Sequence, residues 1–248
     1  MQLSHDRFLD GRLRIWQPKK GYRAGVDPVF LAASVPAKNG QSVLELGCGV
    51  GVASLCLGWR VKGLNLTGLE LQGQYAELAQ RNASENGIGL DVSVGDLTEM
   101  PAAISARSFD HVIANPPYFD RTLGTGSDDA GRDLSLAGET PLTDWIDAGT
   151  KRLMPGGYFS IIQKSNRLPD VLRAMDQRLG EVVVKPLAPR QGRNAELVVI
   201  RARKASKTAF RLAAPLVLHA GEKHLTDAED YSDIARNILR NGAALESF

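Results

Sequence analysis

The stretch Val43-Leu44-Glu45-Leu46-Gly47-Cys48-Gly49-Val50-Gly51-Val52 decides the fold. Its first residues are apolar apart from Glu45 and predict a short strand, and three glycines at alternate positions predict a tight turn into a helix. Without a Cβ at those positions, a ligand can lie against the backbone amides and the start of the helix. The stretch therefore predicts a nucleotide-type cleft.

Two ligand classes bind in such a cleft, and their fingerprints differ. The dinucleotide pattern is G-x-G-x-x-G/A, whose last position here would be Val52. An acid before G-x-G-x-G, here Glu45, resembles motif I of class I methyltransferases that use S-adenosylmethionine (SAM). The stretch thus favours SAM over NAD, and a dehydrogenase is further disfavoured because no acid or base is placed for hydride transfer. The candidate cofactor residues here are Glu45, Gly47, Cys48, Gly49 and Gly51.

Length and composition predict one domain. With 248 residues and 43% apolar content, the chain suits one large α/β domain better than two. The N-terminus has no leader-like pattern and no segment has membrane-spanning length, so we expect a cytoplasmic protein without membrane contact. The cysteines, Cys48 and Cys56, are too few for a disulfide framework and the histidines lack ligand spacing, so no metal is predicted.

Apolar runs on both sides of the glycine turn predict a doubly wound sheet with helices between its strands. The expected strands are 12–17, 42–46, 64–69, 90–94, 109–114, 158–163, 182–185 and 197–201. The last two are expected to form an antiparallel hairpin, with the basic loop Pro189-Arg190-Gln191-Gly192-Arg193-Asn194 between them. The non-periodic stretch 119–137 predicts a functional loop that becomes ordered when substrate binds.

Several helix ends carry sequence signals. Asp27 followed by Pro28 predicts an N-cap and a helix to about Val35. Helices are also expected over 141–153, ended by Met154-Pro155-Gly156-Gly157, and from Val171 to Leu179. Thr226-x-x-Glu229 predicts a capping box for a final helix that ends at Asn241-Gly242. One face of this last helix is expected to hold Tyr231, Ile234, Ala235, Ile238 and Leu239.

Acids follow the next two strands of the predicted core. Glu70, with Leu71 beside it, lies about twenty residues past the glycine turn, where an acid can accept the ribose hydroxyls of a nucleoside. Asp96 is placed to accept the adenine amine, with Leu97 or Met100 against the ring. Because parallel strands end at one edge of a sheet, these side chains are expected to face one cleft.

The fourth core strand ends in Asn115-Pro116-Pro117-Tyr118, the most specific motif of the chain. A planar exocyclic amine is a poor nucleophile, because its lone pair is delocalised. The Asn115 side-chain oxygen and the Pro116 carbonyl can accept its two N–H protons and favour a tetrahedral nitrogen. A following proline holds each of them in extended geometry. Tyr118 offers a flat face for the target base, worth roughly 1 to 3 kcal/mol.

This motif resembles motif IV of amino-methylating class I methyltransferases, which include adenine-N6 and release-factor glutamine enzymes. The chain is most similar to the bacterial tRNA (adenine-N6) methyltransferase family, which modifies the adenosine beside the anticodon of one valine tRNA. The resemblance rests on Gln17-Pro18-Lys19-x-Gly21-Tyr22-Arg23-x-Gly25-x-Asp27, on Asn115 to Phe119, and on Leu216-Val217-Leu218-His219 with Leu225-Thr226. The chain departs from the family in Ala24-Gly25-Val26, where Phe-Gly-Thr is usual.

The resemblance implies a Rossmann-like class I methyltransferase fold, with a mostly parallel seven-stranded sheet and an antiparallel hairpin at its edge. It implies that Tyr22, Arg23 and Asp27 lie near the SAM cofactor, to which Asn115 is also close. Within a single domain it predicts that residues 1–36 close over the cofactor, 37–203 form the catalytic core, and 204–248 add a strand and a helix.

An RNA substrate is expected because basic stretches accompany the catalytic motif, and the resemblance implies that this RNA is a tRNA. The candidate substrate contacts are Tyr118, Phe119, Arg190 and Arg193. Two alternatives stay open at this point. Glutamine methylation of a protein such as a release factor would use the same motif, although the chain lacks the separate helical N-terminal domain of that family. A SAM-binding or RNA-binding protein without catalysis is the other alternative.

Overall fold

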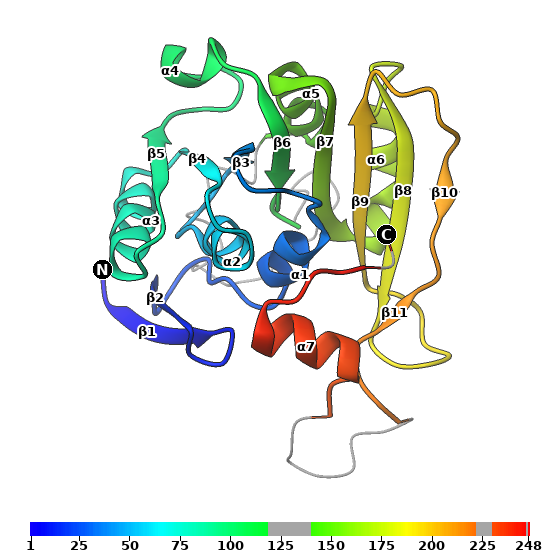
Figure 1. The fold of residues 1–248 in the computed structure, drawn as a ribbon, viewed down its shortest axis with the longest axis horizontal. Helices are drawn as coiled ribbons and strands as arrows, with labels where there is room; N and C mark the ends of the chain where they lie inside the picture. Colours follow the sequence, from blue (N-terminus) through cyan, green and yellow to red (C-terminus); the bar gives the residue numbers. More distant parts are fainter. Residues whose placement is uncertain (119–139, 222–229, 247) are drawn as a thin grey trace, which may run out of the picture.

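A nine-stranded sheet runs through the part of the chain that the structure, a computed structural model, describes: residues 1–118, 140–221, 230–246 and 248. Its strands are β3 (Ser42–Leu46), β4 (Asn65–Glu70), β5 (Leu90–Val94), β6 (Phe109–Ala114), β7 (Leu153–Lys164), β8 (Leu179–Ala188), β9 (Leu197–Lys204), β10 (Arg211–Leu212) and β11 (Leu216–Val217). They lie in the order β10-β8-β9-β7-β6-β3-β4-β5, with β11 also paired to β8 (Figure 1).

The strand directions confirm the expected class I methyltransferase fold. Neighbours from β5 through β4, β3 and β6 to β7 are parallel, whereas β9 is antiparallel to both β7 and β8. The order reverses beside β3, so the ends of β3 and β6 flank the switch point at which such sheets bind ligands. β10 and β11 extend the predicted seven strands at one edge.

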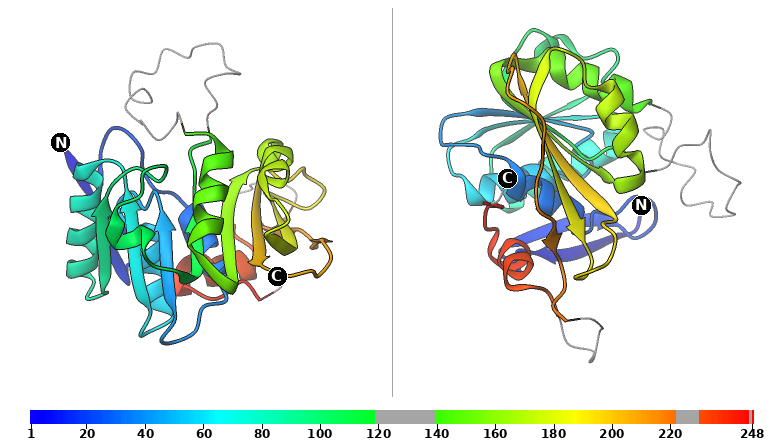
Figure 2. Two further views of the ribbon diagram at one scale, coloured as in Figure 1. Left: turned by 90° about the horizontal axis from the view of Figure 1, so that it is seen from above. Right: turned by 90° about the vertical axis from the view of Figure 1, so that its right-hand side faces the viewer.

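Helices cover both faces of this sheet (Figure 2). They are α1 (Asp27–Ser34), α2 (Val52–Arg60), α3 (Gly73–Glu85), α4 (Ala102–Ser105), α5 (Leu142–Arg152), the 3-10 turn η3 (Ser165–Arg167), α6 (Leu168–Ala174) and α7 (Asp233–Asn241). Ile113 of β6 packs with α1, α2 and α7, whereas its neighbour Val112 packs with α5 and α6. Burial of both faces explains why the core strands are continuous apolar runs.

An N-terminal hairpin of β1 (Leu3–Phe8) and β2 (Leu13–Pro18) packs beside this core. Leu13 and Ile15 are fully buried in the cluster that holds α1, α2 and α7. The Asn82 side chain of α3 bonds the Trp16 backbone on both sides, at 2.8 Å from the Trp16 amide and 3.1 Å from its carbonyl oxygen. The hairpin is therefore fixed to α3 as well as to the sheet layer.

Several expected boundaries are wrong. β1 is largely polar, and β10 and α4 are too short to show a period, so none of these three elements was predicted, whereas β11 lies in the part of the chain, 204–248, where one strand was expected. The turn expected at 154–157 lies inside β7, beside a register irregularity between Phe109 and His111. The helix expected to run to Leu179 ends at Ala174, and Leu179 begins β8.

The final helix differs from its prediction at its start. α7 begins at Asp233, and Ser232 is its N-cap, because its hydroxyl accepts a hydrogen bond from the Ala235 amide. The capping box predicted at 226–229 lies outside the described residues. Ile234, expected on the buried face, is 55% exposed, whereas Ala235, Ile238 and Leu239 are buried as predicted. Gly242 ends the helix in a left-handed conformation.

Candidate functional site

The carboxyl ends of β3, β4, β5 and β6 meet at one edge of the sheet, because Leu46 pairs with both Leu69 and Ala114 and Glu70 pairs with Val94. A pocket opens at this edge. Its walls are Gly47, Leu69, Glu70, Leu71, Gly95, Asp96, Leu97, Thr140 and Trp145. Five of the predicted cofactor residues therefore line one pocket, although they come from three separate strand ends.

The glycine turn has the backbone that its sequence predicts. Gly47, Gly49 and Gly51 all have positive φ angles, between 55° and 88°, which side chains disfavour. A Cβ on Gly47 would lie 2.5 Å from the indole ring of Trp145, so only glycine lets that ring close the pocket wall. The Cys48 side chain is buried and its amide donates to the Leu69 carbonyl, so this residue ties the turn to β4.

Trp145 of α5 is a pocket residue that the sequence reasoning missed. It is 2% exposed, and its indole N–H has no hydrogen-bond partner in the described part of the protein. It lies nearly a hundred residues after the glycine that it covers, on an amphipathic helix whose apolar stripe is typical of core packing. Its sequence carried no signal that separates a pocket wall from the core.

Glu70 is held rigidly in the pocket wall. One carboxylate oxygen accepts from the Gly49 amide at 2.8 Å, and the other accepts from the Gln72 amide at 2.9 Å. Its side chain is buried, and this burial raises its pKa. Since each carboxylate oxygen has two lone pairs, both can accept a further hydrogen bond from hydroxyls of a ligand in the pocket.

Asp96 and the two leucines complete this side of the pocket. One Asp96 oxygen accepts from the amide and the hydroxyl of Thr98, both at 2.8 Å, which fixes the carboxylate as an Asx turn. The other oxygen bonds nothing in the described part of the chain, so it can accept from a donor in the pocket. Leu71 and Leu97 supply apolar walls. A pocket with two acids and flat apolar walls matches an adenosine, whose ribose and amine donate hydrogen bonds.

Glu45 does not line this pocket; it lies beneath the glycine turn. It is 3% exposed, and one carboxylate oxygen accepts from both the amide, at 2.9 Å, and the hydroxyl of Ser54. It thereby fixes the start of α2 to the end of β3. Burial raises the pKa of Glu45 to about 7.

The pH dependence of stability is expected to weaken in Glu45→Gln. Glu45 titrates near 4.5 when unfolded and near 7 when folded, so the folded protein retains a proton that the unfolded chain loses between these values. Its contribution to the unfolding free energy is full below pH 4.5 and falls by on the order of 3 kcal/mol as the pH rises through about 7. Urea unfolding measures the free energy of unfolding at each pH, and this free energy should fall less with rising pH in the variant than in the wild type. The same fall in both proteins would contradict the assignment.

The Asn115-Pro116-Pro117-Tyr118 motif lies directly after β6, beside the turn. The Asn115 amide nitrogen donates to the Tyr22 hydroxyl at 3.2 Å, and the Tyr118 hydroxyl donates to the Asp27 carboxylate. The Tyr118 ring has the Lys164 ammonium 5.4 Å from its centroid. Burial, with Asp27 beside it, raises the Tyr118 pKa, so this hydroxyl stays protonated. Phe119, a predicted substrate contact, lies outside the described residues, as does the predicted loop at 119–137.

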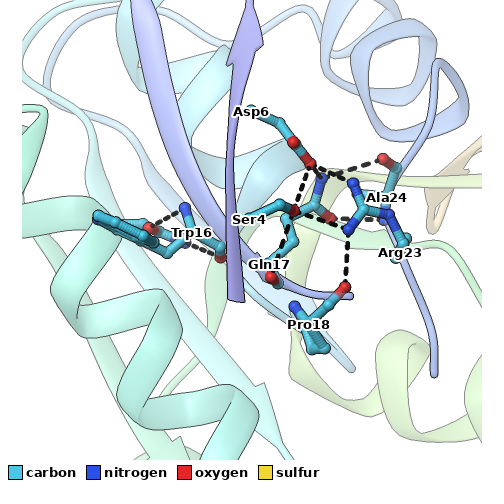
Figure 3. A network of polar contacts seen from close by, with 8 residues as sticks. Ser4, Asp6, Trp16, Gln17, Pro18, Arg23 and Ala24 are labelled. Atoms are coloured by element: carbon cyan, nitrogen blue, oxygen red, sulfur yellow. Dashed lines mark hydrogen bonds and ion pairs between the residues drawn. The ribbon is translucent and has the colours of Figure 1, made fainter. Parts of the chain in front are cut away.

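The segment before α1 reaches this motif, and Asp27 and Arg23 make contacts that the sequence did not predict. Asp27 is the first residue of α1 and not its N-cap, which is Val26. The Tyr22 ring lies over the turn, where a Cβ on Gly49 would be 3.6 Å away. Arg23 points back to the hairpin, where its guanidinium bonds Ser4, Asp6 and Pro18 (Figure 3). The Arg23 side chain therefore bonds the hairpin, and it is not among the residues that line the pocket.

The two loop arginines predicted to contact substrate lie in different environments. Arg190 is held by an ion pair with Asp230 and by the Ala220 carbonyl at 2.6 Å, so its role is to close the corner after β11. Arg193 is exposed and makes no ion pair within the described part of the chain.

Comparison with known proteins places the chain among methyltransferases. The family model described as "Methyltransferase small domain" matches residues 25–185. A tRNA1(Val) (adenine(37)-N6)-methyltransferase of Porphyromonas gingivalis is 30% identical over 200 residues, which cover 73% of this chain and 76% of that protein. A protein of the same name from Glaesserella parasuis is 30% identical over 142 residues, and the chain spans only 58% of its length.

Solved structures are similar in fold. A predicted O-methyltransferase from Agrobacterium tumefaciens has a TM-score of 0.69 at 24% identity, covering 88% of this chain and 97% of its own. TrmN from Thermus thermophilus has a TM-score of 0.50 at 19% identity, and the match covers 68% of this chain and 46% of that protein. At these identities the likeness extends to the fold alone.

Proposed function

Since the chain belongs to the methyltransferase small domain family, we propose that this SAM-dependent methyltransferase modifies the exocyclic N6 amine of an adenine in tRNA. The observation that carries the proposal is the position of Asn115 to Tyr118 beside the glycine turn at the switch point of the sheet. The names of the two relatives support adenine and tRNA as the target.

The pocket suits SAM by the chemistry of its walls. Glu70 would accept the ribose hydroxyls, Asp96 the adenine amine, and Leu71 and Leu97 would lie against the base. When bound, SAM supplies the methyl group on an electrophilic sulfonium. Within the described residues, no group of three His, Cys, Asp or Glu side chains could hold a metal ion, and no helix is long and apolar enough to span a bilayer.

The motif supplies two acceptors and a platform for the target amine. The Asn115 amide nitrogen is engaged with Tyr22, so its oxygen is left to accept one N–H of the amine. The Pro116 carbonyl is the second acceptor, and the ring of Tyr118 stacks on the base. These contacts direct the nitrogen lone pair out of the ring plane toward the methyl donor. No strong base is required, because the amine becomes acidic once it is alkylated.

Three cations on one face of the sheet give it a positive charge that suits the RNA backbone. Arg211 and Arg201 both pair with Val183, so their side chains and that of Lys185, two residues on, share a face. Arg211 is exposed, whereas Lys185 is 4% exposed and adds its charge to this face from beneath the surface. Lys185 on β8 lies three strands from the end of β6, roughly 14 Å at the usual strand spacing. We assign this face, together with Arg193, to phosphate contacts.

An Arg193→Gln/Arg211→Gln double variant should therefore bind tRNA less tightly. Loss of two phosphate contacts should make the negative slope of log K against log salt shallower by about 1.5, and it should raise the Kd at low salt roughly tenfold. Binding titrations at several salt concentrations measure both. The matched control is Lys38→Gln/Lys62→Gln, two exposed lysines that precede β3 and β4 at the opposite edge. Equal slopes in the two double variants would remove this face from the RNA footprint.

The amide of glutamine is the second candidate acceptor, because its nitrogen is planar and the same two oxygens would activate it. The deciding experiment incubates the protein with methyl-labelled SAM and bacterial tRNA, and in parallel with release factor, then identifies the labelled product by mass spectrometry. We expect N6-methyladenosine from tRNA. Label only in glutamine would retain the chemistry of Asn115 and overturn the RNA substrate, and label in neither would overturn both.

A further inference from the structure

The N-terminal hairpin holds a segment of the chain that in turn contacts the catalytic motif from outside the pocket. We propose that residues 22–27, which we call the anchored segment, position Asn115 and Tyr118, and that Arg23 is a positioning residue that acts through Tyr22. This rests on the proposed function, in which Asn115 orients the target amine.

The middle of the anchored segment, at Arg23 and Ala24, is fixed to the hairpin by polar contacts (Figure 3). The Arg23 guanidinium donates to the Ser4 hydroxyl at 2.7 Å, the Pro18 carbonyl at 2.8 Å and the Asp6 carboxylate at 2.5 Å. Bonds to three separate groups define the position of the guanidinium in every direction. A lysine could not reproduce this geometry, since it has no planar fork.

Gln17 of β2 fixes the next residue of the segment in the same way. It is 1% exposed; its oxygen accepts from the Ala24 amide at 2.8 Å, and its nitrogen donates to Asp6 at 2.9 Å. The Asp6 carboxylate therefore accepts hydrogen bonds from both Arg23 and Gln17. Because a buried side-chain amide with both ends bonded is costly to disrupt, the backbone at 23–24 is held to the hairpin.

The two end residues of the segment, Tyr22 and Asp27, contact the first and the last residue of the motif. The Tyr22 hydroxyl accepts from the Asn115 amide nitrogen at 3.2 Å, and the Asp27 carboxylate accepts from the Tyr118 hydroxyl. The Tyr75 hydroxyl of α3 donates to the Tyr22 carbonyl at 3.4 Å, which gives that residue a second support. The anchored segment thus restrains both the amide plane of Asn115 and the ring of Tyr118.

This restraint matters because the reaction depends on orientation. The bond to Tyr22 places the Asn115 nitrogen away from the target and leaves its oxygen for the amine. Displacement of such a group by about 1 Å can cost about 100-fold in rate. Arg23, Asp6 and Gln17 are absent from the residues that line the pocket, so their effect on the rate would pass through this contact.

A test that does not depend on substrate follows the Asn115 side-chain amide by NMR. Its signal is identified in ¹⁵N spectra of the full chain as the one lost in Asn115→Asp. We expect this signal to move in Tyr22→Phe and in Arg23→Gln. It should stay in place in Arg7→Gln, a control that removes an exposed arginine of the same hairpin with no hydrogen bond in the described residues. An unmoved signal in both test variants would overturn the proposal, whichever substrate the enzyme uses.

Kinetics provide the second arm, on whichever acceptor the wild type methylates. Tyr22→Phe and Arg23→Gln should each lower kcat roughly tenfold, with the KM for that acceptor and the Kd for SAM within about twofold. The double variant should lose little more than either single one, because both act on one contact. Losses that multiply to about 100-fold, or a rise in KM at unchanged kcat, would overturn the relay from Arg23 through Tyr22.

Discussion

Asn115→Ala should lower kcat for methyl transfer by at least about 100-fold, with the Kd for SAM changed less than about twofold. The loss is large because the amide oxygen stabilises charge that develops only as the methyl group is transferred, and removal of one such contact typically costs 100-fold or more. Asn115 is not among the residues that line the pocket, which is why cofactor affinity should survive.

Single-turnover assays with methyl-labelled SAM measure the rate, and calorimetry measures the Kd. The matched control is Asn237→Ala, because Asn237 is an exposed asparagine on α7 that bonds the Asn241 side chain. An equal loss of SAM binding and turnover in Asn115→Ala would mean that Asn115 belongs to the cofactor site. A wild-type rate would remove it from the chemistry altogether.

Glu70→Ala should weaken SAM binding roughly 100-fold. Hydrogen bonds to a charged group contribute about 1.5 to 3 kcal/mol each, and the variant loses those to the ribose together with the support that Glu70 gives the Gly49 amide. The turn would then lose its rigid link to β4. Because the effect is on the cofactor, saturating SAM should restore much of kcat, in contrast to Asn115→Ala.

The measurement is a calorimetric titration with SAM. Glu70→Gln keeps the shape and loses the charge, so its Kd should fall between those of the wild type and Glu70→Ala. Glu77→Ala removes an exposed acid of α3 and serves as the control. Unchanged SAM affinity in Glu70→Ala would contradict the assignment of this pocket to the ribose.

The sequence predicted the catalytic core well because its signals are local. A glycine turn needs positive φ angles at fixed positions, and Gly47, Gly49 and Gly51 adopt them. Apolar runs of strand length between helical segments predicted the parallel strands of a doubly wound sheet. Since these strands end at one edge, Glu70 and Asp96 could be predicted to share a cleft without knowledge of their contacts.

Side-chain partners were less predictable. Arg23 was expected near the cofactor from the family resemblance, and Arg190 was expected near the substrate because it lies in a basic loop. Asp6, seventeen residues away, binds the first, and Asp230, forty residues away, binds the second. Nothing in a single sequence reports such a pairing. Glu45 was expected at the cofactor by its place before the turn, yet its oxygen bonds Ser54 of α2.

The sequence by itself thus determined the class I methyltransferase core and the position of Asn115 to Tyr118 after β6, because the glycine turn and the alternation of strands and helices along the chain follow from local residue types. Only the tertiary structure decided that Trp145 closes the pocket and that Tyr22 and Asp27 contact the motif. Those contacts join residues that are about ninety positions apart. They depend on how the hairpin and helices pack around the sheet, which local sequence preferences do not specify.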